Sequence, residues 1–175
     1  MSKIFRSFLV LAGLTMILAL MPCPQATAAD TETFVHRSPD FTLIFPKWRK
    51  AYSRNPNSVL RKALDRNEET SFDVALSDLS ENKTYKDLAK DMIDRLKDEY
   101  GAYNCSTLYE RDIKLKDGTP AYELEVKWTH PSPKLLVYCY ELAVFKDKKI
   151  ITVTVSAFSQ ISDKLKEIPL SLTLK

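Results

Sequence analysis

The stretch STLYERDIKLKDGTPAYELEVKWTHPSPKLLVYCYELAVFKDKKIITVTVSAF, residues 106–158, decides the fold of this chain. Its β-branched and aromatic residues alternate with polar ones in four short runs. Three turn signals separate the runs: Asp117-Gly118, then residues 130–133, and then residues 146–149. Alternating runs divided by such turns predict four consecutive antiparallel strands, with Asp117-Gly118 as a two-residue hairpin turn.

The turns also predict which residues face each other across the sheet. The predicted neighbours are Ile113 and Tyr122, Tyr109 and Val126, Trp128 and Leu136, Leu124 and Tyr140, and Val144 and Ile151. In this register one face is apolar except for Arg111, and a slip of one residue would move a strand's side chains to the opposite face. The other face mixes apolar residues with four charged ones, which predicts partial cover by a second layer. The four are Glu123, Glu125, Lys127 and Glu141.

Before this meander, the sequence predicts a helix over residues 85–100. Thr84 and Asp87 have the spacing of a capping box, and Gly101 stands where helices commonly end in a left-handed residue. An apolar stripe at helical spacing predicts packing against the sheet. The opposite stripe carries four aspartates, which we interpret as a solvated face because a straight helix cannot wrap them around a cation.

The flanking segments complete an α+β prediction, an antiparallel sheet flanked by helices. Residues 41–45 alternate as a strand that Pro46 ends, after a polar lead-in over residues 31–39. Residues 59–64 and 71–76 can form a hairpin. A short helix over residues 162–168 is a candidate cover for the mixed face, and residues 170–174 alternate as a final strand.

The N-terminal residues 1–29 have the pattern of a secretory signal peptide. Lys3 and Arg6 precede an uncharged run over residues 8–21, and small residues allow cleavage after Ala28 or Ala29. As a helix that run spans about 21 Å, which is short of the roughly 30 Å core of a bilayer. We therefore predict an exported chain, periplasmic or secreted, with a single domain over residues 30–175 and no transmembrane helix in its mature part.

The alternative to a free mature chain is a lipoprotein anchored at Cys23. Leu20 and Cys23 have the spacing of a bacterial lipobox, although Pro22 stands where that motif has a small residue. Either processing route predicts export. Loss of the leader lowers the formal charge from +3 to +1, because Lys3 and Arg6 leave with it. This balance gives no electrostatic case for a nucleic-acid partner.

Two cysteines remain in the mature chain, Cys105 and Cys139. An even number in an exported chain permits a disulfide. The predicted register nevertheless separates them along and across the strands, so a bond would require residues 101–107 to curl back over the sheet.

The sequence contains no recognisable catalytic, metal or cofactor motif. Its two histidines, His36 and His130, are interpreted as surface residues, and no P-loop, G-x-G-x-x-G or G-x-S-x-G stretch exists. The aromatic residues on the apolar face are interpreted as core. The alternative is a ligand pocket beside Trp128, Tyr138 and Tyr140.

Several stretches resemble PsbP-like (Mog/PsbP-like) domains, which include exported bacterial proteins of unknown function. The resemblance lies in residues 41–48 (FTLIFPKW), the helix 84–101, residues 117–124 (DGTPAYEL) and the closing residues 168–174. Many members have Gly before the tryptophan, whereas Lys47 stands here. The resemblance implies an antiparallel sheet flanked by helices and a largely non-enzymatic assembly or binding role. It transfers no catalytic residue.

These observations favour an exported, non-catalytic module that binds a protein partner in the cell envelope. A small-ligand carrier or sensor with an aromatic-lined pocket is the alternative. An enzyme would need a titratable pair in a cleft, such as His130 with a carboxylate, and is the least favoured hypothesis.

Overall fold

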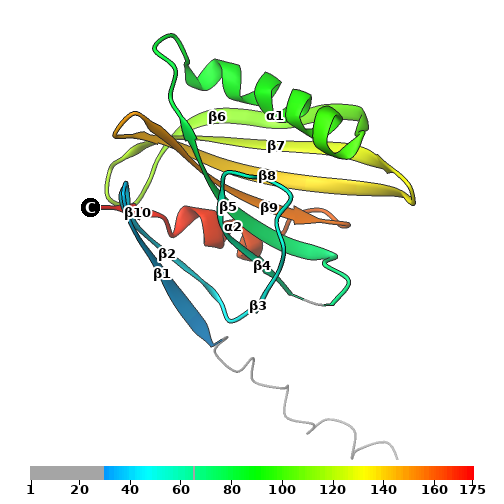
Figure 1. Ribbon diagram of the computed structural model, residues 1–175, viewed down its shortest axis with the longest axis horizontal. Coiled ribbons are helices and arrows are strands. Elements are labelled where there is room, and N and C mark those ends of the chain that lie inside the picture. The colour runs from blue at the N-terminus through cyan, green and yellow to red at the C-terminus, as the bar shows by residue number, and fades with distance from the viewer. Residues whose placement is uncertain (1–29, 65) are drawn as a thin grey trace, which may run out of the picture.

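The computed structural model describes residues 30–64 and 66–175 (Figure 1). The predicted signal peptide, its cleavage sites at Ala28 and Ala29, and Cys23 lie outside the described residues. The elements in chain order are β1 (Thr31–Arg37), β2 (Asp40–Pro46), β3 (Arg49–Lys50), β4 (Ser58–Ala63), β5 (Thr70–Asp78), α1 (Tyr85–Tyr100), β6 (Tyr103–Lys114), β7 (Pro120–Pro131), β8 (Lys134–Lys146), β9 (Lys149–Ala157), α2 (Asp163–Leu170) and β10 (Thr173–Leu174).

The strands form two antiparallel sheets. The larger has seven strands in the order β3-β4-β5-β9-β8-β7-β6, and the smaller has three in the order β1-β2-β10. The predicted α+β class and the meander β6–β9 are therefore confirmed. The segment over residues 31–39 was wrongly predicted to be a lead-in, because residues 31–37 pair with β2 as strand β1.

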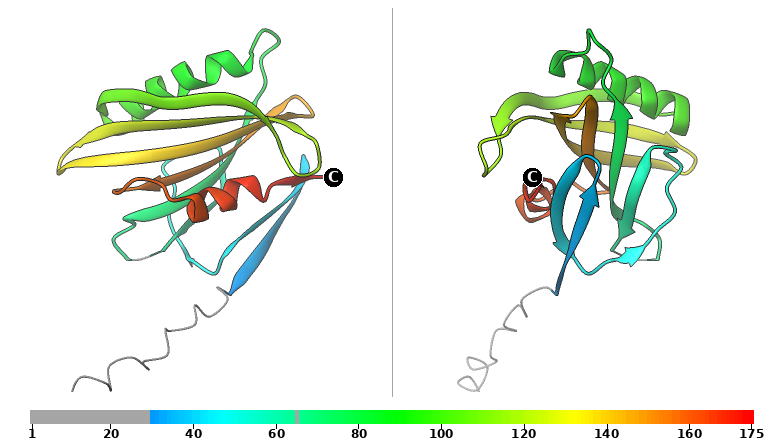
Figure 2. Two further views of the ribbon diagram at one scale, coloured as in Figure 1. Left: turned by 180° about the vertical axis from the view of Figure 1, so that it is seen from behind. Right: turned by 60° about the vertical axis from the view of Figure 1, so that its left-hand side comes forward.

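The two faces of the large sheet are covered differently (Figure 2). Helix α1 packs on one face, which we call the α1 face, with Leu88, Met92 and Leu96 buried against strands β7 and β8. Helix α2 and strand β2 pack on the other, the α2 face, where Ile168 and Phe41 join a second buried cluster. The alternation of side chains along each strand divides the core into these two clusters.

Helix α1 has the ends that the sequence predicts. The backbone N–H of Thr84 donates to the Asp87 carboxylate at 2.8 Å, as in a capping box. At the other end Gly101 has a φ of 64°, and its N–H donates to the carbonyl of Lys97 at 2.9 Å. Only glycine adopts this conformation without steric cost, so the helix ends here.

The predicted register is right for β8 with β9, where Val144 pairs with Ile151. It is wrong for β7, which is displaced by one residue against both neighbours. Trp128 pairs with Val137 and not with Leu136. On the other side the predicted pairing of β7 with β6 is also shifted by one position. Because β7 is displaced by one residue against each neighbour, β6 and β8 keep the predicted alignment with each other. Only the side chains of β7 lie on the face opposite to the predicted one.

The lengths of two loops cause this displacement. The first hairpin has a three-residue loop, because the N–H of Leu115 donates to the carbonyl of Thr119 at 2.9 Å and Gly118 adopts a φ of 84°. Three-residue hairpin loops consist of a turn followed by one residue in the left-handed conformation, and Gly118 is that residue here. The second hairpin has a two-residue loop, since Pro131 pairs directly with Lys134. As a result Tyr122, Leu124, Val126 and Trp128 face α1, and the carboxylates between them face α2.

Candidate functional site

An open groove of about 500 Å³ runs beside helix α1 on the α1 face. It exists because α1 packs against β6 and β7, at one side of the seven-stranded sheet. The part of the same face that β5 and β9 form carries no helix (Figure 2). The segment over residues 52–55 and strand β4 line the far side of the groove.

Small polar side chains form the floor of the groove. Thr154 and Ser156 of β9 line it, whereas Val153 and Val155, which alternate with them along the strand, are fully buried on the α2 face. Ser71 of β5 lies directly opposite Ser156. The alternation of hydroxyl and valine side chains along β9 thus separates an open face from a packed one.

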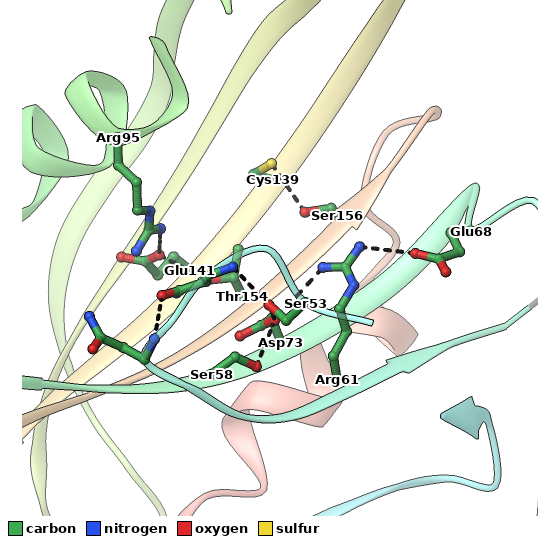
Figure 3. Close-up of polar contacts among 12 residues, drawn as sticks. Ser53, Ser58, Arg61, Glu68, Asp73, Arg95, Cys139, Glu141, Thr154 and Ser156 are labelled. Carbon is green, nitrogen blue, oxygen red and sulfur yellow. Dashed lines mark hydrogen bonds and ion pairs between the residues drawn. The ribbon is translucent and has the colours of Figure 1, made fainter. Parts of the chain in front are cut away.

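A buried ion pair joins α1 to the floor. Arg95 Nη2 donates to Glu141 Oε2 at 2.8 Å, and Thr154 Oγ1 donates to the same oxygen at 2.8 Å (Figure 3). The side chain of Glu141 is only 4% exposed. The neighbouring Glu141 carboxylate raises the pKa of the Arg95 guanidinium, so Arg95 keeps its positive charge.

A second polar cluster centres on Asp73, which lies opposite Arg61 in the β4–β5 ladder. Ser53 Oγ and Ser58 Oγ donate to Asp73 Oδ2 at 2.6 and 3.0 Å (Figure 3). Arg61 Nη1 lies 3.8 Å from the same oxygen, and Arg61 Nη2 lies 3.4 Å from Glu68 Oε2. Two buried atoms of this cluster, Arg61 Nε and Asp73 Oδ1, have no hydrogen-bond partner among the described residues.

Aromatic side chains close one end of the groove. The rings of Tyr100 and Trp128 have centroids 5.8 Å apart, and Trp128 Nε1 donates to Cys139 Sγ at 3.4 Å. The Cys139 sulfur also lies 3.3 Å from Ser156 Oγ. Burial raises the pKa of the Cys139 thiol, so this cysteine is protonated and a poor nucleophile. Phe158 lines the same end and is 43% exposed.

The structure does not bring the predicted pocket residues together. Trp128 lines the groove, but Tyr138 and Tyr140 lie on the α2 face. The Tyr140 hydroxyl donates to Glu123 Oε2 at 2.6 Å, which is part of the packing on that face. The predicted pocket fails because β7 is displaced by one residue from the predicted register, which places Trp128 on the face opposite both tyrosines.

The other predicted site residues are also placed. Cys105 and Cys139 are both free, in agreement with the separation that the strands impose. His130 lies at the edge of the groove, with its ring centroid 5.8 Å from that of Trp128. The described residues contain no group of three side chains able to hold a metal ion. No helix in the described ranges is both long and apolar enough to cross a bilayer.

Sequence reasoning missed Arg61, Asp73 and Arg95. The first two lie inside runs that were predicted as strands, where a charged residue has to face either solvent or a partner. That was the available signal. It could not show that the two residues stand opposite each other, because the turn signal over residues 66–69 does not fix the length of the loop, and the pairing of the strands depends on that length.

A comparison with solved structures found proteins of the same architecture. The solution structure of cyanobacterial PsbP (CyanoP) from Synechocystis sp. PCC 6803 matches with a TM-score of 0.66 and 15% sequence identity, over 89% of this chain and 99% of that one. The fold is PsbP-like. The Saccharomyces cerevisiae Ran-binding protein Mog1p also matches, with a TM-score of 0.58 and 11% identity, over 84% of this chain and 96% of that one.

At these identities the PsbP-like likeness shows the fold alone. Comparisons with protein-family models and with curated proteins found no match. The function of this chain therefore has to be argued from its own groove.

Proposed function

We propose that this chain is an exported, non-catalytic binding module of the cell envelope, and that it holds a protein partner in the groove beside α1. The observation that carries the proposal is the groove itself, an open hollow with a polar floor and an aromatic end. Concave sites that combine apolar or aromatic side chains with a few polar groups are typical of binding sites. The fold shared with a protein named as Ran-binding supports a role in protein binding.

The chemistry of the groove supports binding more than catalysis. Arg95 and Glu141 neutralise each other, and two serine hydroxyls occupy one oxygen of Asp73. The Cys139 thiol is kept protonated by burial. Arg95, Glu141 and Cys139 are thus not poised as a free base or nucleophile.

Affinity capture from the envelope fraction of the producing cells tests this proposal. Phe158→Ser removes a 43% exposed aromatic side chain from the groove, and Leu136→Ser removes a 44% exposed aliphatic side chain from outside it. We expect one protein to be captured by the wild-type chain and by Leu136→Ser, and to be lost with Phe158→Ser. Equal capture by all three chains would contradict the proposal.

Export is the part of the proposal that rests on residues 1–29. The pattern of charge, apolar run and small residues supports cleavage after Ala28 or Ala29. The mass of the mature N-terminus in the producing cells tests it. A diacylglyceryl adduct on Cys23 would instead establish the lipoprotein, and an uncleaved chain in the cytoplasm would exclude both routes.

A small-ligand carrier or sensor is the second candidate function. It is favoured by the volume of the groove, because small-molecule sites commonly measure about 300–1,000 Å³. Mass spectrometry of the chain purified from its own cells and then denatured tests it. A small molecule released by the wild-type chain and by Leu136→Ser, but not by Phe158→Ser, would support this candidate.

A further inference from the structure

The charged side chains that line the groove balance one another. They comprise three arginines and three acids, namely Arg54, Arg61, Arg95, Glu68, Asp73 and Glu99. A charged ligand would therefore meet a repelling group beside each attracting one, and it would lose its hydration for little gain. The groove is suited to an uncharged ligand that forms hydrogen bonds.

Two residues that line the groove have one hydrogen-bond donor and one acceptor available for such a ligand. Arg61 Nε carries a hydrogen and Asp73 Oδ1 has free lone pairs, yet both are buried and unpartnered within the described chain. Arg61 and Asp73 are direct neighbours on β4 and β5. A buried polar group left unpaired destabilises the folded chain, so a ligand that satisfies both atoms removes two such costs.

An extended peptide residue has the matching pair of groups. In an antiparallel ladder one residue offers its own N–H and C=O on the same side of the chain. Both atoms are shielded from solvent in the free chain, so the side chains of Arg61 and Asp73 have to rotate toward the groove on binding. The N–H of the peptide residue can then donate to Asp73 Oδ1 while its carbonyl accepts from Arg61 Nε. The aromatic end, formed in part by Trp128 and Phe158, can take an apolar side chain of the same segment.

The length of the hollow also fits a chain. A second hollow of about 210 Å³ continues beside α1 and shares Met92, Arg95 and Glu99 with the first. Together they extend along the helix from Leu88 to Tyr100. Twelve helical residues rise about 18 Å, and roughly five extended residues cover that length.

We infer that the groove binds an extended, uncharged polypeptide segment through the Arg61–Asp73 pair, with an apolar side chain at the aromatic end. This inference rests on the proposed function, since it names the chemistry of the segment by which the protein partner is held. The backbone of the segment supplies the two hydrogen bonds, and the apolar residue supplies most of the burial.

Selection of a phage-displayed random heptapeptide library on the full chain provides the probe. We expect enriched peptides without charged residues at their centre. Arg61→Lys keeps the charge beside Asp73 and Glu68 but removes the Nε donor, and Asp73→Asn can turn the free acceptor into a donor. Each should weaken binding of a selected peptide by at least about tenfold, as expected for one lost hydrogen bond. The control Glu99→Gln, which also lines the groove, should change it less than about twofold.

N-methylation of the selected peptide tests the same contact with the protein unaltered. Methylation of one backbone nitrogen, the donor to Asp73, should weaken binding by at least about tenfold, and most other positions should tolerate it. This result does not depend on how well a variant folds. Equal affinity for wild type, Arg61→Lys and Asp73→Asn, or equal tolerance of methylation at every position, would overturn the inference.

Two further outcomes separate this inference from the proposed function. Binding of maltotetraose in competition with the peptide would show that the groove selects vicinal hydroxyls, and the inference would be wrong. Phe158→Ser could lose the native partner while the library yields no enriched peptide. The groove would then remain the binding site, and only the inference that it binds an extended, uncharged segment would be wrong. Capture of the partner by Phe158→Ser at wild-type levels would overturn the proposed function.

Discussion

The α1 face and the α2 face of the large sheet differ in how completely their buried charges are paired. On the α2 face the buried Glu123 and Glu125 are matched by Arg111, Tyr140 and Lys166, and α2 closes over them. On the α1 face the Arg61–Asp73 cluster is left with a free donor and a free acceptor beside an open groove. The first arrangement completes a core, whereas the second leaves hydrogen bonds for another molecule.

Removal of Lys166 should have the largest effect on stability. Its Nζ lies 2.8 Å from Glu125 Oε2, and the Glu125 side chain is 3% exposed. Lys166→Met leaves that carboxylate buried without its cation, which should lower the free energy of unfolding by about 3 kcal/mol. Urea unfolding measures it. The exposed Lys164→Met is the matched control on the same helix and should change it by less than about 0.5 kcal/mol.

A second comparison uses neighbouring residues of β9 that point to opposite faces. Val155 is fully buried on the α2 face, and Ser156 lines the groove. Val155→Ala should cost about 2 kcal/mol of unfolding free energy, because it leaves a cavity in a packed core. Ser156→Ala should cost less than about 1 kcal/mol, because it loses only a weak contact with Cys139. Equal losses in urea unfolding would show that the two faces are packed alike.

The α2 face should also make the chain sensitive to alkali. Burial, and then the hydrogen bond to Glu123, raise the pKa of the Tyr140 hydroxyl above its ordinary value of 10.0. A raised folded-state pKa leaves stability intact below pH 10 and removes it as the pH rises further, because the unfolded chain releases this proton first. The free energy of unfolding should therefore fall above pH 10.

Tyr140→Phe separates this contribution from that of other groups. The variant should be less stable than the wild type at pH 7, because Glu123 loses its phenolic partner, and its stability should fall less steeply above pH 10. Tyr52→Phe, at an 81% exposed position, serves as the control and should follow the wild type. Parallel curves for Tyr140→Phe and the wild type would contradict the role given to this hydroxyl.

The sequence was informative where a local signal is strong. Helix α1 begins where the capping pair Thr84 and Asp87 predicts and ends at the left-handed Gly101, as the sequence indicated. The hairpin of β8 and β9 was also placed correctly, with Val144 opposite Ile151. In these segments the propensity, the turn chemistry and the hydrophobic pattern agree with one another.

The strand β7 was misplaced because alternation alone cannot tell which face is buried. Glu123 and Glu125 look like solvent-facing residues, and only their distant partners Arg111 and Lys166 make their burial favourable. A change of one residue in loop length then moves every side chain of the strand to the opposite face of the sheet. The groove was missed for a related reason, since it depends on which strands α1 leaves uncovered.

Photocrosslinking in the producing cells tests the central claim, that the groove is the binding site, most directly. p-Benzoylphenylalanine would replace Phe158 in the groove in one chain and Leu136 outside it in another, at positions of matched exposure. We predict a covalent adduct with one envelope protein from position 158 and none from position 136. An adduct from position 136 alone, or equal adducts from both positions, would contradict the account.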